Sequence, residues 1–199
     1  MSEISRRDAL RRIALMLAAT GVVDQASARE VHHLASQGTA ASGGTYTPTA
    51  FTEHEYHTLE RLTDLIIPVE NDAPGALAAG APAWIDTLAG ANDQLKSIYA
   101  GGFEWLDKAM RQRGAGDFLS ASAPRQVEML DSIAYRRNET PELAPGIEFF
   151  AWVRRMTVDA FYTSEIGIRD LDYRGNTALA SYPEPVEAIA FALKKSGLG

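Results

Sequence analysis

The chain has 199 residues, 46% of them hydrophobic, a formal net charge of −7 and no cysteine. This length and composition fit one globular domain with a core of its own, and the acidic charge excludes the basic surface that nucleic-acid binding requires. The absence of cysteine excludes disulfides, thiolate-held iron–sulfur clusters, cysteine–zinc sites, haem attached through Cys-x-x-Cys-His and a cysteine nucleophile on this chain.

Residues 1–28 have the organisation of an export signal. Arg6 and Arg7 precede an apolar run over residues 13–23, and the small residues 26–28 follow it. This order is typical of a secretory signal peptide, and the paired arginines indicate the twin-arginine route, which carries folded proteins. We therefore expect recognition through Arg6 and Arg7, cleavage after Ala28 and a periplasmic protein. An amphipathic N-terminal helix, or an anchor that stays uncleaved, is the alternative. The apolar run is shorter than the ~20 residues of a membrane-spanning helix.

Residues 29–50 are small and polar over most of their length. Such a composition predicts a flexible leader between the signal and the folded domain. An extended arm that lies on a partner is the alternative interpretation.

The folded domain is expected over residues 51–199, and it begins with a helix. Thr52 and Glu55 have the spacing of a capping box. Apolar residues then recur at helical spacing, and Pro68 ends the helix. The repeated apolar positions are Leu59, Leu62 and Ile66.

Five further segments have apolar residues at helical spacing, and no segment shows sustained alternation of Val, Ile and Thr. The sequence therefore predicts an all-α domain of about six helices with long ordered loops. In the second of these five segments, Gly101 and Gly102 are expected to permit close helix packing. The five predicted helices are a short one after Pro82, one over 95–110 that closes near Gly114, one from Ser122, one over 149–160 and a last one over 186–193.

Few residues suggest chemistry of their own. His54 and His57 lie one helical turn apart and could share a metal, although two histidines do not complete a site. Glu148, Asp159 and Glu165 could supply paired carboxylates for glycoside chemistry, but acidic residues are common on any solvated helix. The sequence contains no Gly-x-Ser-x-Gly elbow and no phosphate-binding glycine motif.

The segment over residues 161–176 is aromatic and charged but has no periodicity. Loops of this length are usually functional or disordered, and the aromatic content argues against disorder. Two interpretations stay open: a loop packed on its own domain, or a partner-binding surface, where aromatic residues and Arg are enriched. The candidate partner-binding residues are Phe161, Tyr162, Ile166, Ile168, Arg169, Tyr173, Arg174 and Asn176.

Several blocks of the sequence together resemble the gluconate 2-dehydrogenase subunit 3 family. They are the first-helix block at 51–68, Pro74-Gly-Ala76, Trp84-Ile-Asp86, Phe161-Tyr-Thr-Ser164 and Tyr173-Arg-Gly-Asn176. The last two blocks are the most specific, and the resemblance covers about residues 50–190. Two residues depart from the family pattern, which has Pro in the place of Glu165 and Gly in the place of Asp172.

The resemblance implies a non-catalytic small subunit. In such complexes a large subunit with the glucose-methanol-choline oxidoreductase fold carries FAD and acts on sugars, sugar acids or polyols. A cytochrome c with haem often takes the electrons, and the complex is often membrane-associated. The large subunit commonly lacks a signal and is exported with the small one through the twin-arginine machinery. The alternative is a stand-alone periplasmic enzyme or binding module that uses its carboxylates or His54 and His57.

Overall fold

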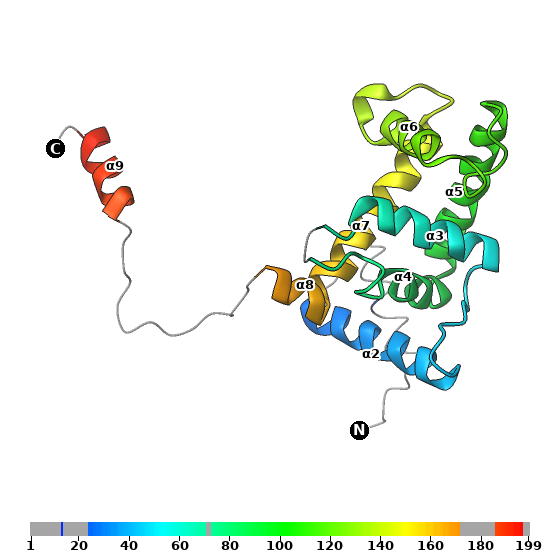
Figure 1. Ribbon diagram of the computed structural model, residues 1–199, viewed down its shortest axis with the longest axis horizontal. Coiled ribbons are helices and arrows are strands. Elements are labelled where there is room, and N and C mark those ends of the chain that lie inside the picture. Colours follow the sequence, from blue (N-terminus) through cyan, green and yellow to red (C-terminus); the bar gives the residue numbers. More distant parts are fainter. Residues whose placement is uncertain (1–12, 14–23, 71–72, 172–185, 197–199) are drawn as a thin grey trace.

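The computed structural model describes residues 13, 24–70, 73–171 and 186–196. In these residues the chain forms eight α-helices and one 3-10 turn, and no strand (Figure 1). The predicted all-α fold is confirmed. The helices are α2 Gln25–Ala41, α3 Glu53–Ile66, α4 Ala81–Gly90, α5 Asp93–Gln112, α6 Ala123–Ile133, η1 Arg136–Asn138, α7 Ala144–Thr163, α8 Glu165–Asp170 and α9 Val186–Ser196.

Helix α7 is the element around which the domain is built. It packs against α2, α3, α4, α5, α6 and α8 (Figure 1). Its sequence places an apolar residue at nearly every inward position, so its buried side chains extend from Gly146 to Phe161. A helix surrounded by so many others needs a wide apolar face, and α7 has one.

Four aromatic rings form the centre of the core between α5, α7 and the segment before α3. Phe51, Tyr99, Phe103 and Phe149 lie with ring centroids 5.3 to 5.9 Å apart, several of them edge to face. Gly102 permits this packing, because a Cβ at that position would overlap the ring of Phe149. The expected role of this glycine in close helix packing is thus confirmed.

The start of α3 is fixed by the capping box that the sequence predicts. The Thr52 hydroxyl accepts a hydrogen bond from the Glu55 backbone N–H (3.3 Å), and the Glu55 carboxylate accepts one from the Thr52 backbone N–H (2.8 Å). These bonds satisfy backbone donors that have no partner inside the helix. They hold the chain entry to α3 in place.

A buried carboxylate holds the segment before α3. Asp86 on α4 is fully buried and accepts five hydrogen bonds. Its Oδ2 accepts from the Tyr46 hydroxyl (2.8 Å), the Thr49 backbone N–H (2.8 Å) and the Thr49 hydroxyl (2.9 Å); its Oδ1 accepts from the backbone N–H groups of Ala50 (3.0 Å) and Phe51 (3.1 Å). A charge removed from water is tolerated only with this kind of complete hydrogen bonding.

In place of the flexible leader expected over 29–50, the structure has helix α2 over Gln25–Ala41. Asp24 caps the helix by accepting from the backbone N–H groups of Ala26 (3.1 Å) and Ser27 (3.0 Å). Ala28, Val31 and Ala35, at i, i+3 and i+7, are buried, and α2 packs on α4 and α7. The small polar residues from Ser36 onward stay exposed or half-buried and take no part in this buried contact. Residues 42–50 continue without a helix to α3.

The last helix, α9, lies where the sequence predicts it, and each of its side chains is exposed. Its large apolar side chains are Val186, Ile189, Phe191 and Leu193. Among the helices that the structure describes, none combines the length and the apolar character needed to cross a membrane.

We predict that Asp86→Asn destabilises the domain. Whichever way the amide is oriented, its NH2 group faces at least one backbone N–H that now bonds to a carboxylate oxygen. An unsatisfied buried donor and the loss of charge-assisted bonds should together lower the free energy of unfolding by about 2–3 kcal/mol. Chemical denaturation monitored by circular dichroism measures this.

The matched control is Asp131→Asn, which changes an exposed aspartate on α6. It should alter the free energy of unfolding by less than about 0.5 kcal/mol. Equal effects of the two variants would show that the Asp86 hydrogen bonds contribute nothing specific.

Candidate partner-binding site

The segment that the sequence singles out over residues 161–176 contains the last turn of α7 and the short helix α8. Ser164 separates the two: its hydroxyl donates to the Phe161 carbonyl (2.6 Å) and accepts from the Gly167 backbone N–H (3.0 Å). Gly167 is buried, and a Cβ there would overlap the Phe161 carbonyl. The Phe-Tyr-Thr-Ser block and Gly167 therefore form one tight corner between α7 and α8.

This corner exposes only some of the candidate residues. Phe161 is 2% exposed and belongs to the core, which leaves it no surface for a partner. Tyr162 packs edge to face on Phe161, with ring centroids 5.0 Å apart, and is 40% exposed. Ile166 and Ile168 are half-buried, and Arg169 is exposed. The candidates Tyr173, Arg174 and Asn176 lie outside the described residues.

Glu165 fits the place where the family pattern has Pro. It is the first residue of α8, where a negative charge interacts favourably with the helix dipole. Its carboxylate also pairs with Arg169 one turn later (3.0 Å). Proline is favoured at the same helical position because its missing N–H is not needed there. Glu in place of Pro at position 165 is therefore compatible with the start of α8.

Helix α2 and the α8 corner together line a groove of about 620 Å³, which we call the α2–α8 groove. Helix α2, which lies in the segment expected to be a flexible leader, and residues 163–168 thus lie together on one surface. Sequence reasoning missed the α2 side of this groove. The spacing of Val31 and Ala35 behind Asp24 was the signal that could have revealed it. The lining residues include Arg29, His32, His33 and Ser36 from α2 and Thr163, Glu165, Ile166 and Ile168 from the corner.

His32 joins α2 to the end of α7 beneath this groove. Its Nε2 lies 3.0 Å from the Ala160 carbonyl oxygen and 3.2 Å from the Thr163 hydroxyl. A carbonyl only accepts, so Nε2 carries the hydrogen in this contact. Burial lowers the pKa of His32, with the Ala160 hydrogen bond opposing that shift. The neutral imidazole therefore fits the docked position of α2.

We predict that acidification loosens α2. The pKa of His32 in the unfolded chain is near the ordinary 6.5, and its pKa in the folded chain is lower. At a pH between these two values, His32 is protonated in the unfolded chain but neutral in the folded one. The stability from neutral His32 is present above pH 6.5 and is lost as the pH falls from 6.5 through the folded pKa. Hydrogen exchange of the α2 amides should speed up between about pH 7.5 and about pH 5.5, after correction for intrinsic exchange.

His32→Gln keeps a donor toward Ala160 and should remove this pH dependence. His33→Gln is the matched control, because His33 is exposed and bonds to Gln37 within α2 (2.7 Å). Exchange that depends on pH equally in wild type and His32→Gln would contradict the assignment.

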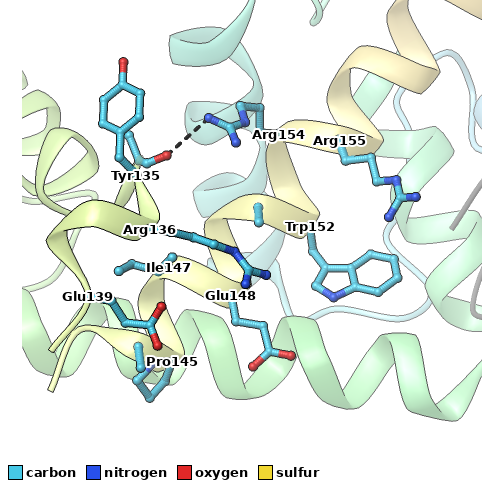
Figure 2. A pocket seen from close by; sticks show the side chains of 12 residues that line it. Tyr135, Arg136, Glu139, Pro145, Ile147, Glu148, Trp152, Arg154 and Arg155 are labelled. Atoms are coloured by element: carbon cyan, nitrogen blue, oxygen red, sulfur yellow. Dashed lines mark hydrogen bonds between the residues drawn. The ribbon is translucent and has the colours of Figure 1, made fainter. Parts of the chain in front are cut away.

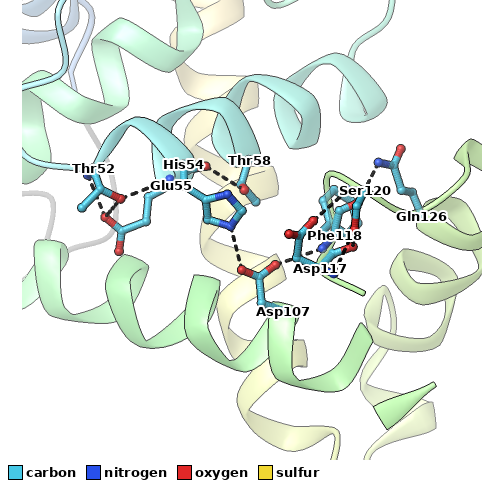
Figure 3. Close-up of polar contacts among 9 residues, drawn as sticks. All are labelled: Thr52, His54, Glu55, Thr58, Asp107, Asp117, Phe118, Ser120 and Gln126. Carbon is cyan, nitrogen blue, oxygen red and sulfur yellow. Dashed lines mark hydrogen bonds and ion pairs between the residues drawn. The ribbon is translucent and has the colours of Figure 1, made fainter. Parts of the chain in front are cut away.

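The two histidines of α3 bond to different carboxylates, and Figure 3 shows the contact of His54 with Asp107. His54 Nε2 lies 2.7 Å from Asp107 Oδ2 on α5, and Asp107 Oδ1 accepts from the Phe118 backbone N–H (3.0 Å). His57 Nδ1 lies 2.8 Å from Glu60 Oε2, and this hydrogen bond raises the pKa of His57. His54 therefore ties α3 to α5 and to the turn after it. Over the described ranges, no group of three or more His, Cys, Asp or Glu is placed to hold a metal ion.

The three candidate carboxylates do not converge either. Glu148 and Asp159 stand eleven residues apart on α7, which at 1.5 Å per residue places them about 16 Å apart along the helix. Glycosidase carboxylates lie roughly 5–9.5 Å apart. Burial raises the pKa of Asp159, whereas Glu165 is exposed and paired with Arg169.

The predicted export signal is almost wholly outside the described residues, including Arg6 and Arg7. Ile13 is described, and its side chain is buried. Ala28, the predicted cleavage residue, lies in the first turn of α2 with no exposed surface. Its carbonyl oxygen accepts a hydrogen bond from Trp84 Nε1 on α4 (3.1 Å).

Comparison with known proteins gives one family. The family model described as gluconate 2-dehydrogenase subunit 3 matches residues 53–179, which is more than half of the chain. This range holds Asp86, all of α7 and the α8 corner, and it begins after α2. No curated protein and no solved structure matches the chain.

Proposed function

The chain belongs to the gluconate 2-dehydrogenase subunit 3 family, and from this membership we propose that it is the non-catalytic small subunit of an FAD-dependent dehydrogenase complex. The family match carries this proposal. The catalytic subunit is of the glucose-methanol-choline oxidoreductase type and acts on a sugar, a sugar acid or a polyol. FAD belongs to that subunit, and a cytochrome c with haem is a further electron-accepting subunit of the complex.

The geometry of the domain supports a binding role. Its two candidate histidines and Glu165 are engaged in separate structural contacts: His54 with Asp107, His57 with Glu60 and Glu165 with Arg169. Its α8 corner, in contrast, exposes Tyr162 and Arg169, the sequence neighbours of Thr163 and Ile168, which line the α2–α8 groove. An exposed aromatic residue and an arginine next to a groove are the residue types that dominate protein interfaces. In this proposal the groove and the corner contact the catalytic subunit.

The proposed function also includes export of the catalytic subunit. Arg6 and Arg7 address the twin-arginine machinery, which transports the folded small subunit together with a catalytic subunit that has no signal of its own. The small subunit thereby stabilises the catalytic subunit and brings it to the periplasm, where the complex is membrane-associated. A folded helical domain with a twin-arginine sequence is the form of carrier that this role needs.

Co-purification tests the partnership. The tagged full-length chain should recover a protein with the absorbance spectrum of oxidised flavin, which reduces an artificial acceptor when given a sugar, sugar acid or polyol. Tyr162→Ala should lower the recovery about fivefold or more, as truncation of an interface hot spot does. Val127→Ala, which truncates an exposed residue of α6 outside the groove, is the control. Recovery of the chain alone, or substrate oxidation by the chain alone, would contradict the proposal.

The double variant Arg6→Lys, Arg7→Lys tests the export step separately. We expect dehydrogenase activity to disappear from the periplasmic fraction while the complex still forms in the cytoplasm, because the paired arginines are the recognised feature. Activity in whole-cell lysates serves as the control for expression. Unchanged periplasmic activity in the double variant would rule out transport of the catalytic subunit by this chain.

A further inference from the structure

A second groove lies at the opposite end of α7, between that helix and the η1 turn. It has a volume of about 840 Å³ and is lined by three arginines, Arg136, Arg154 and Arg155. Figure 2 shows Arg136 extending from η1 over α7, with Arg154 and Arg155 on α7 itself. Arg137 follows Arg136 in the η1 turn. We call these four residues the arginine cluster; all four are exposed.

Carboxylates in the described part of the chain neutralise the arginine cluster only in part: Asp159, one helical turn from Arg155, interacts with it electrostatically. None of the four forms an ion pair there, unlike Arg61 and Arg169. Arg154 donates to the Ala134 carbonyl (3.3 Å), and Arg155 lies over the Trp152 ring, 5.7 Å from its centroid. Glu139 and Glu148 also line the groove, where three arginines outnumber these two carboxylates by one, and Arg137 adds a fourth positive charge beside it. A chain with a net charge of −7 thus concentrates positive charge in one place.

Aromatic side chains accompany the arginines. Tyr135 is 51% exposed and lies under the Arg137 guanidinium, 4.3 Å from the ring centroid. Trp152 is half-buried on the wall of the groove (Figure 2). Arginine held against an aromatic face keeps its hydrogen-bond donors available for a carboxylate, and the ring shields the pair from water. Such a site favours an acidic protein surface over an apolar one.

One face of α7 connects this cluster to the α2–α8 groove. Glu148, Trp152, Arg155, Asp159 and Tyr162 recur at i, i+4, i+7, i+11 and i+14, and each of them is exposed or half-buried. At 1.5 Å per residue this strip is about 21 Å long. A single partner can therefore cover both grooves by lying along α7.

We propose that the arginine cluster binds an acidic surface of the dehydrogenase catalytic subunit, as one end of an interface that runs along α7 from the α2–α8 groove. The inference rests on the proposed function, because the partner is the same subunit. Carboxylates of that subunit would form bidentate hydrogen bonds with Arg136 and Arg155. Along the strip, Trp152 belongs to the groove of the arginine cluster and Tyr162 stands at the other end, with Asp159 between them.

Charge reversal in the full complex tests the cluster. Arg136→Glu with Arg155→Glu in the tagged chain should weaken binding of the flavin-containing catalytic subunit about tenfold or more, because like charges then face each other. Arg136→Lys with Arg155→Lys keeps the charge and should weaken binding less. Arg154 stays unchanged, since it bonds to the Ala134 carbonyl. Wild-type binding should also weaken as salt is raised, through screening.

Lys96→Glu with Arg111→Glu is the matched control. Both residues are exposed on α5, line neither groove and change the net charge by the same amount. Equal melting temperatures of all variants exclude misfolding. Loss of binding in both double-glutamate variants, or in neither, overturns the inference while capture by wild type upholds the proposed function. Failure of the wild-type chain to capture a flavoprotein overturns both.

Discussion

The buried carboxylate of Asp86 is the interaction on which the rest of the domain depends. It lies on α4, yet its five partners lie in the segment that leads into α3. With that segment held, Tyr46 stacks on Tyr56 and Phe51 enters the aromatic cluster of α5 and α7. Burial raises the pKa of the Tyr46 phenol, which therefore stays a donor to Asp86. The hydrogen bonds of Asp86 thus hold α4, the entry to α3 and the aromatic core together.

Helix α7 combines core and surface in one element. Its inward face carries the aromatic and aliphatic contacts of the domain, and its outward strip links the two grooves. A partner that lies on this strip contacts a helix that six other helices pack against. Little conformational entropy is then lost on binding, because the surface is already ordered before the partner arrives.

The sequence predicted those elements whose signals are local. The capping box at Thr52 and Glu55 and the stripe of α7 each depend on neighbours within a few residues, and each lies where it was predicted. Of the glycine pair in α5, Gly102 packs against Phe149, whereas Gly101 has open space around it. Helix α2 was not predicted, because its small and polar residues carry a weak local signal and its buried face is defined by packing on α4 and α7. Tertiary packing, rather than intrinsic propensity, decides such a segment.

The candidate partner-binding site was predictable only in part, because tertiary packing also decides which of its residues are exposed. The composition of the 161–176 segment pointed to a surface, but no local pattern separates buried Phe161 from exposed Tyr162. Asp86 carries a local signal for a buried charge, because it is the one charged residue of the helix over 81–90. The arginines of η1 and α7 meet only because the fold returns the chain from α6 to α7, so their proximity is not visible in the sequence.

The position of Ala28 bears on the order of events during maturation. A peptidase must hold the chain extended around the bond that it cuts, whereas Ala28 is buried in the first turn of α2 and bonded to Trp84. Cutting after Ala28 would therefore require that turn to unwind first, through local opening of the helix. A chain shortened in this way would begin at Arg29 and lose the Asp24 cap, so proteolysis and docking of α2 compete kinetically for the same few residues.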